Sequence, residues 1–212
     1  MAERIRLVRD RSAQVKDDVD DAELLRMLMA RHPRALRASW LRFAPLVHRL
    51  LKRALGPEDD VSELAQLVFE HLFRHVSELR QPSALRPFVI ALTTSFIRAE
   101  LRNRWVRRWL GVGQPEAAPR ISSVPPPDPR SREPLRRLYF ILDRFKTEDR
   151  IAFAFHFLEG LSLEEVAEAL NLSPPATQRV LARVWSRIVL LIERDTALLD
   201  YLSSLEGQGA CA

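Results

Sequence analysis

A proline-rich segment at residues 111–134 interrupts the helical pattern of this chain and limits the folds open to it. The segment contains the run Pro125-Pro126-Pro127 and has little apolar periodicity, which is typical of an extended linker. At about 3.1 Å per residue, such a linker can span roughly 60 Å. We therefore predict an all-α protein of two helical domains, whose parts are a tail at 1–17, a first domain at 18–112, a linker at 113–132, a second domain at 133–205 and a tail at 206–212.

Apolar residues recur with the 3.6-residue period of an amphipathic helix on both sides of the linker, and no alternating strand pattern is found. Helices are predicted at 20–30, 35–55, 60–79, 83–110, 134–145 and 148–159. Gly56-Pro57 and Gly160 are stop signals, and Pro134 fits the first turn of its helix. The helix at 60–79 begins with Asp60-Val61-Ser62-Glu63, whose spacing predicts a capping box.

The predicted helix at 60–79 has an apolar stripe and aromatic residues beside it. The stripe consists of Leu64, Leu67, Val68, Leu72, Val76 and Leu79. Phe69 and Phe73 either widen the core, which is the favoured interpretation, or face a partner. His71 and His75 are four residues apart and could in principle hold a metal ion. Because no intervening Glu and no third ligand lies nearby, we interpret them as partly buried helix histidines.

Arginine and tryptophan are combined in the second half of the predicted helix at 83–110. This half carries arginines at 98, 102, 104, 107 and 108 against one acid, Glu100, and Trp105 and Trp109 lie among them. Cations and flat rings in one segment are typical of surfaces that hold phosphates and unstacked bases. A solvated basic face with two core tryptophans is the alternative interpretation.

Downstream of the linker, a short helix, a three-residue turn and a longer helix predict a helix-turn-helix. Ser162 and Glu165 have capping-box spacing at the start of the short helix, and Pro174 opens the long one after the turn at 171–173. Arginines recur every four residues along the long helix, at 179, 183 and 187, which favours a DNA-binding role. A generic helical hairpin is the alternative.

Charge and composition narrow the functional classes further. The net charge of +5 favours an anionic partner. No unbroken apolar stretch is long enough to span a membrane and the N-terminus lacks an apolar signal segment, so we expect a cytoplasmic protein without membrane insertion. The single cysteine, Cys211, can form neither an intrachain disulfide nor a cysteine-ligated metal site.

Three motifs, in this order and spacing, resemble the extracytoplasmic-function group of sigma-70 factors, which keep only sigma regions two and four. Residues 63–69, ELAQLVF, resemble the family's DLVQEVF segment, and residues 85–89, LRPFV, resemble the LRAWL-like motif of the next helix. Residues 159–173, EGLSLEEVAEALNLS, are similar nearly position for position to the family's EGLSYEEIAEILGIS. The resemblance covers about residues 20–195.

The resemblance implies a transcription initiation factor that binds core RNA polymerase and promoter DNA, with region two at 18–112 and region four at 133–205. Its implied polymerase contacts are Asp60, Glu63, Gln66, Phe69 and Phe73. Its implied minus-ten DNA contacts are Ser95, Arg98, Arg102, Arg104, Trp105, Arg107 and Arg108. Its implied minus-thirty-five contacts are Thr177, Gln178, Arg179, Arg183 and Arg187. An anti-sigma factor is a candidate partner, and no cofactor, metal or small-molecule substrate is expected.

The chain departs from the family pattern at residues expected to read DNA. Ser95 and Arg98 stand where many members have asparagine and aspartate, and residues 176–181, ATQRVL, stand where TVKSRL is frequent. Two functions therefore remain open. One is a sigma factor that assists strand opening, and the other is a sigma-like protein that binds polymerase or an anti-sigma partner without opening promoters.

Two other classes fit the sequence less well. A one-component repressor needs a ligand-binding or dimerisation core, and the residues outside the helix-turn-helix are already assigned to a basic domain and a linker. An enzyme fits least, because the chain has no glycine-rich phosphate loop, nucleophile elbow or CxxC pair.

Overall fold

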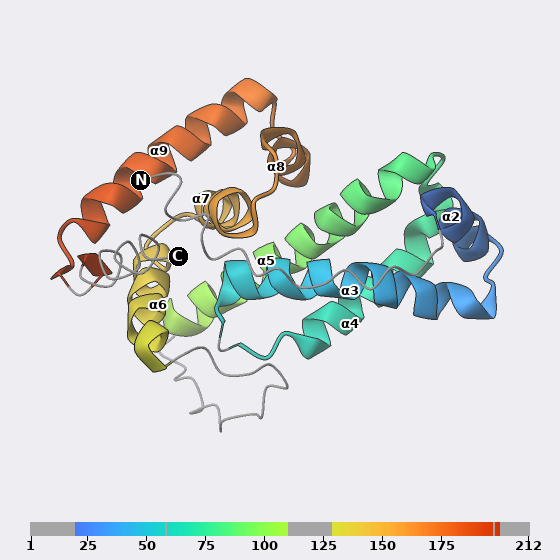
Figure 1. Ribbon diagram of the computed structural model, residues 1–212, viewed down its shortest axis with the longest axis horizontal. Helices are drawn as coiled ribbons and strands as arrows, with labels where there is room; N and C mark the ends of the chain where they lie inside the picture. Colours follow the sequence, from blue (N-terminus) through green and yellow to red (C-terminus); the bar gives the residue numbers. More distant parts are fainter. Residues whose placement is uncertain (1–19, 58, 110–128, 197, 200–212) are drawn as a thin grey trace, which may run out of the picture.

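The computed structural model describes residues 20–57, 59–109, 129–196 and 198–199, and all regular secondary structure in these ranges is helical (Figure 1). The elements are α2 Asp21–Met29, α3 Pro33–Leu55, α4 Ser62–His75, η2 Val76–Glu78, η3 Pro82–Ala84, α5 Leu85–Trp109, α6 Pro129–Leu142, α7 Thr147–Phe153, η4 Ala154–Glu159, α8 Leu163–Leu170 and α9 Pro174–Ile192. Both η2 and η3 are 3₁₀ turns, and η4 is a π-helical segment. The predicted all-α fold is confirmed. Residues 113–128 of the predicted linker and the tails at 1–17 and 206–212 lie outside the described residues.

The first bundle consists of α3, α4 and α5, with α2 packed against α3. Leu50 of α3, Val68 of α4 and Ile97 of α5 are fully buried where the three helices meet. Phe69 is also buried and Phe73 packs at the edge of the same cluster, which confirms that they widen the core. The stripe predicted for α4 is wrong in one respect, because Leu67 is exposed. The helix packs against both α3 and α5, so its buried face is rotated toward Phe69.

The start and end of α4 differ from the prediction. Its N-cap is Val61, which has no side-chain acceptor, and the Ser62 N–H instead donates to Oδ1 of Asp60 at 3.0 Å. The predicted capping box is therefore wrong, because Asp60, which lies one residue before the N-cap, accepts the hydrogen bond from the Ser62 N–H. The α-helix ends at His75, and the chain continues as the 3₁₀ turn η2 before reaching Leu79.

The helix-turn-helix of the second bundle is present as predicted. The Glu165 N–H donates to Oγ of Ser162 at 3.1 Å, and the Ser162 N–H donates to Oε2 of Glu165 at 2.9 Å, which confirms the capping box. Asn171 ends α8 in the left-handed region at φ 56°, and Pro174 opens α9. Gly160 ends η4 with φ 81°. The position of Pro134 was predicted wrongly, because α6 begins at Pro129 and contains Pro134 in its interior.

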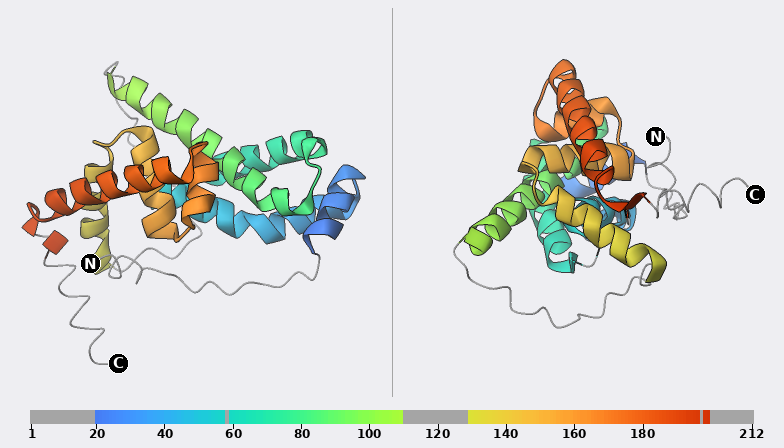
Figure 2. Two further views of the ribbon diagram at one scale, coloured as in Figure 1. Left: turned by 90° about the horizontal axis from the view of Figure 1, so that it is seen from above. Right: turned by 90° about the vertical axis from the view of Figure 1, so that its left-hand side faces the viewer.

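The two bundles are docked against each other, although the linker is long enough to let them lie far apart. Helices α7 and α8 pack against α5 and η4 packs against α3, so these orange segments of the second bundle lie beside the first bundle (Figures 1 and 2). Phe155 and Leu170 of the second bundle belong to the same buried cluster as Leu50 and Ile97 of the first. A second cluster, formed by α6, α7 and α9, belongs to the second bundle alone.

The C-terminal end of α3 is capped by side chains of the second bundle. The Tyr139 hydroxyl lies 3.2 Å from the carbonyl oxygen of Lys52 and 3.0 Å from that of Arg53. Arg150, which is only 4% exposed, donates to the carbonyls of Ala54 at 2.6 Å and Leu55 at 2.7 Å. Because the last carbonyls of a helix lack intrahelical partners, these contacts supply donors from the other bundle, and the Lys52 carbonyl also accepts from the Gly56 N–H at 3.0 Å. Burial raises the pKa of Tyr139 to about 12, so the phenol keeps its proton.

Candidate nucleic-acid interface

The basic half of α5 is the first candidate surface, and its C-terminal turns project away from both bundles in Figure 2. Trp105 is 60% exposed, so it is not a core residue and the alternative that buried it is wrong. Among the described residues, Arg102 is exposed and has no hydrogen bond or ion pair. The side chains of Arg108 and Trp109 lie outside the described part.

Arg104 is a structural residue of this surface. Its guanidinium pairs with Glu100 at 2.8 Å and Asp59 at 3.1 Å and donates to the carbonyl of Leu55 at 3.3 Å. Burial opposes the charge, but the two carboxylates outweigh this effect and raise the pKa of Arg104. Arg104 therefore fixes the loop after α3 against α5 and has little freedom to hold a phosphate.

Arg98 and Ser95 are also engaged within the protein. Nε of Arg98 lies 3.7 Å from Oε1 of Glu148, and its Nη2 donates to the carbonyl of Leu170 at 3.3 Å, both in the second bundle. The Ser95 hydroxyl donates to the carbonyl of Ala91 one turn earlier at 3.0 Å. Arg107 is half-exposed and pairs with Glu100 at 3.1 Å. The predicted minus-ten residues thus divide into internally paired side chains and an exposed set around Arg102 and Trp105.

The long helix α9 is the second candidate surface. Gln178 and Arg179 are exposed and, within the ranges that the structure describes, have no polar partner. Thr177 is fully buried and its hydroxyl donates to the carbonyl of Ser173 at 3.2 Å, so it does not reach this surface. Arg183 donates to the buried carboxylate of Asp149 at 2.6 Å. Arg187 lies on the same side of α9, with its guanidinium 4.5 Å from the ring centre of Phe145.

A third surface lies on α3 and α4 and contains a residue that sequence reasoning missed. Trp40 is 43% exposed, and its ring centre lies 4.7 Å from that of the buried Phe69. Phe73 follows at 6.3 Å from Phe69, and the exposed Glu63 and Gln66 lie on the same helix. We call Trp40, Glu63, Gln66 and Phe73 the α3–α4 surface. The spacing of Leu36 and Trp40, four apart in a basic segment, was the available signal.

Histidines accompany this surface without forming a metal site. His71 and His75 stack at 5.6 Å between ring centres, and His71 packs edge-on against Phe96. Burial, and then Lys52, lower the pKa of His48 against a smaller opposing effect of Asp60, so its imidazole is neutral at neutral pH. Among the residues that the structure describes, no group of three or more His, Cys, Asp or Glu could hold a metal ion.

Within the described part of the chain, no helix combines the length and the apolar character that crossing a bilayer requires.

Comparison with known proteins identifies similar chains. The family model for Sigma-70 region 2 matches residues 40–107, from the middle of α3 to the basic end of α5. The RNA polymerase sigma factor NccH of Alcaligenes xylosoxydans xylosoxydans is 26% identical over 170 residues, which cover 78% of this chain and 85% of that relative. CnrH, solved in complex with the cytosolic domain of CnrY, has a TM-score of 0.61 at 18% identity, covering 84% of this chain and 99% of that one, which is a likeness of fold.

Proposed function

Because the chain is similar to sigma factors of the sigma-70 family, we propose that it is a member of the extracytoplasmic-function group that binds core RNA polymerase, recognises promoter DNA and assists strand opening. The observation that carries this proposal is the exposed Trp105 three residues from Arg102, which is exposed and has no partner among the described residues, on the helix that ends the region-two match. An exposed ring next to a free cation suits an unstacked base and its phosphate. The chain would act in the cytoplasm without catalysis of its own.

In this proposal the α3–α4 surface binds core polymerase. Trp40 supplies a large aromatic side chain of the kind that dominates protein interfaces, and the buried Phe69 holds its ring in place. Asp60 contributes indirectly by capping α4, whereas Glu63 and Gln66 are available for direct contacts. The resemblance alone had placed Phe69 in direct contact with polymerase, but its burial favours a supporting role.

The combined change Glu63→Lys and Gln66→Ala is expected to weaken binding of the full chain to core RNA polymerase by roughly tenfold or more, because an unmatched charge would enter the contact. Binding is measured with core enzyme from the same bacterium, and helicity by circular dichroism. Glu193→Lys, a charge reversal at the exposed C-cap of α9, is the matched control and should leave affinity unchanged. Unchanged affinity in the double variant, with unchanged helicity, would place the polymerase contact elsewhere.

The second bundle is proposed to bind duplex DNA through the N-terminal turns of α9. Within the ranges that the structure describes, Gln178 and Arg179 are exposed and have no polar partner, so both can enter a major groove. Arg183 and Arg187 lie further along α9, but Arg183 is bonded to Asp149 and Arg187 packs on Phe145. Each would have to leave its partner within the second bundle before it could contact DNA. Thr177 supports the helix from inside.

Arg179→Gln is expected to reduce the salt dependence of duplex binding, because each lost phosphate contact removes about 0.9 from the log–log salt slope. Binding of the holoenzyme to promoter duplex is measured across a range of salt concentrations. Arg194→Gln removes an exposed cation beyond the C-terminal end of α9 and should leave the slope unaltered. Equal slopes for Arg179→Gln and the unmodified chain would move the DNA surface away from these turns.

A second candidate function is favoured by the docking of the two bundles. Glu148 and the Leu170 carbonyl hold Arg98, so region two cannot use this arginine on DNA until the bundles separate. A chain whose two bundles stayed docked against each other after it had bound polymerase would act as an interaction protein without opening promoters. A regulatory protein that covers the same surfaces is a proposed partner, since CnrH is described in complex with the cytosolic domain of CnrY.

A further inference from the structure

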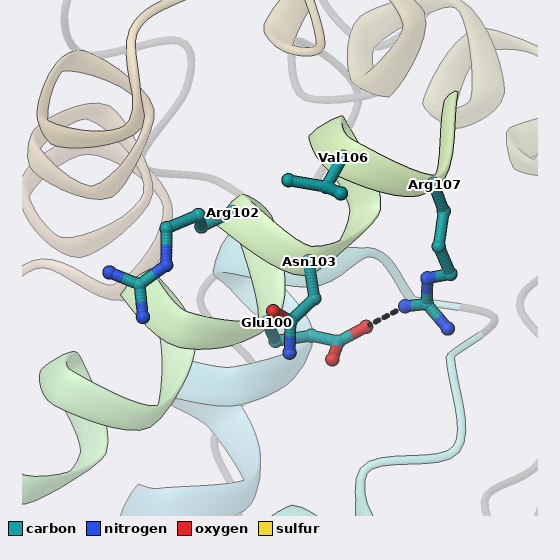
Figure 3. Close-up of a pocket in the computed structure, with 5 residues that line it drawn as sticks. All are labelled: Glu100, Arg102, Asn103, Val106 and Arg107. Atoms are coloured by element: carbon teal, nitrogen blue, oxygen red, sulfur yellow. Dashed lines mark hydrogen bonds and ion pairs between the residues drawn. The ribbon is translucent and has the colours of Figure 1, made fainter. Parts of the chain in front are cut away.

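We propose that Asn103 and Val106 read two neighbouring bases, an adenine and a thymine, of the separated promoter strand. This inference rests on the proposed function and names the residues that would give region two its sequence preference. Neither residue belongs to the set that the resemblance implies. Both lie in an open pocket on the projecting end of α5 (Figure 3).

The pocket is built from one face of a single helix. Its lining consists of Glu100, Arg102, Asn103, Val106 and Arg107. Residues three and four apart on a helix lie on the same face, so the amide of Asn103 and the side chain of Val106 are neighbours. Figure 3 shows Asn103 between Glu100 and Val106, with Arg102 on one side and Arg107 on the other.

Charge makes this pocket suitable for a nucleic-acid strand. The carboxylate of Glu100 would repel phosphates, but it accepts from Arg104 at 2.8 Å and from Arg107 at 3.1 Å, which compensates its charge. Arg102 is exposed and unpaired among the described residues, so it can hold the phosphate between two bound nucleotides. The occupant that fits is therefore a single DNA strand.

The two central side chains have complementary chemistry. Asn103 is exposed and its amide has no polar partner within the described ranges, so both its donor and its acceptor are available. A side-chain amide of this kind pairs through two hydrogen bonds with the edge of adenine. Val106 is 40% exposed, and an apolar side chain contacts the methyl group of thymine. Together they favour an adenine next to a thymine.

The engagement of Ser95 and Arg98 supports this assignment. The resemblance places base reading at these two positions, but the Ser95 hydroxyl is bonded to its own helix and Arg98 to the second bundle. The unoccupied amide and the exposed valine lie two turns further along α5. Base reading is therefore assigned to the end of the helix that projects from the bundles.

The test uses holoenzyme reconstituted from core polymerase and the full chain, with fluorescent single-stranded oligonucleotides from promoters that it melts. Each adenine is replaced in turn by the other bases, and affinities are compared. Asn103→Ala is expected to lose a roughly five- to 150-fold preference for adenine at one position and to keep its preferences elsewhere. Gln81→Ala, which removes an exposed amide far along the chain from the pocket, is the matched control.

Deoxyuridine in place of thymine tests Val106, because it removes only the methyl group. At the position beside the adenine, this replacement should lower affinity roughly fourfold for the unmodified chain and not at all for Val106→Ala. Helicity of each variant is checked, since both side chains are exposed and should tolerate alanine.

The outcomes separate this inference from the proposed function. A holoenzyme that binds none of the single strands would overturn both. A holoenzyme that binds them while Asn103→Ala keeps its full adenine preference, or while Val106→Ala still distinguishes thymine from deoxyuridine, would overturn the base-reading assignment and leave the proposed function standing.

Discussion

Replacing Arg150 by methionine is expected to lower the free energy of unfolding of the full chain by roughly 2 to 5 kcal/mol. Methionine keeps much of the length of the side chain but removes the donors to the carbonyls of Ala54 and Leu55. A buried acceptor left without a partner costs about 1 to 3 kcal/mol. This cost applies in full to the carbonyl of Ala54, whereas the carbonyl of Leu55 keeps its hydrogen bond from Arg104 at 3.3 Å. The ion pair of Arg150 with Asp143 is lost as well, although half-exposed Asp143 can be rehydrated.

Thermal and chemical unfolding of the full chain measure this effect, and the melting temperature should fall by on the order of 10 °C. Arg136→Met is the matched control, because Arg136 is highly exposed and the same change there should stay within about 0.5 kcal/mol. The docked arrangement also predicts one unfolding transition for both bundles, since they share a buried cluster. If Arg150→Met leaves the free energy of unfolding unchanged and the chain unfolds in two transitions, the bundles are undocked in solution.

Trp105→Ala is expected to lower the population of open promoter complexes roughly five- to 150-fold, because stacking of a base on an aromatic ring is worth about 1 to 3 kcal/mol. Since the ring is 60% exposed, the same substitution should change the stability of the isolated protein by less than about 0.5 kcal/mol. Open complexes are measured on a fully duplex promoter and on a template with a pre-melted bubble.

The bubble should restore activity to Trp105→Ala if strand opening is the defective step. Phe140→Ala removes an aromatic ring of similar exposure from α6 and should leave open complexes unchanged. A variant that melts several degrees lower would show that Trp105 supports the fold. A bubble that restores nothing would assign the ring a role other than in opening.

Local signals in the sequence predicted the elements of this fold well. The spacing of Ser162 and Glu165 predicted a capping box that the structure contains, and Gly160 and Gly56 end the helices that they were expected to end. These features depend on interactions within a few residues. Thr177 could also have been predicted as buried, because it precedes Leu181, Val184 and Ile188 at helical spacing.

Contacts between distant parts of the chain could not be predicted in the same way. Arg150 and Tyr139 are one arginine and one tyrosine in ordinary helical segments, and no local pattern indicates that they cap α3. The periodicity of the sequence does not predict the partners of Arg98, Arg104 and Arg183 either. All three were therefore predicted as DNA contacts from their charge and from the resemblance. Burial and pairing then distinguish them from the exposed Arg102 and Arg179.

Promoter opening by the reconstituted holoenzyme tests the central proposal most directly. Core RNA polymerase is combined with the full chain on supercoiled genomic DNA, unpaired thymines are oxidised with permanganate, and the modified sites are mapped by sequencing. We expect unpaired thymines that depend on both the chain and the core enzyme, at sites that share a sequence and include an adenine next to a thymine. A chain that binds core polymerase but produces no such sites would contradict the proposal and leave a sigma-like interaction protein in its place.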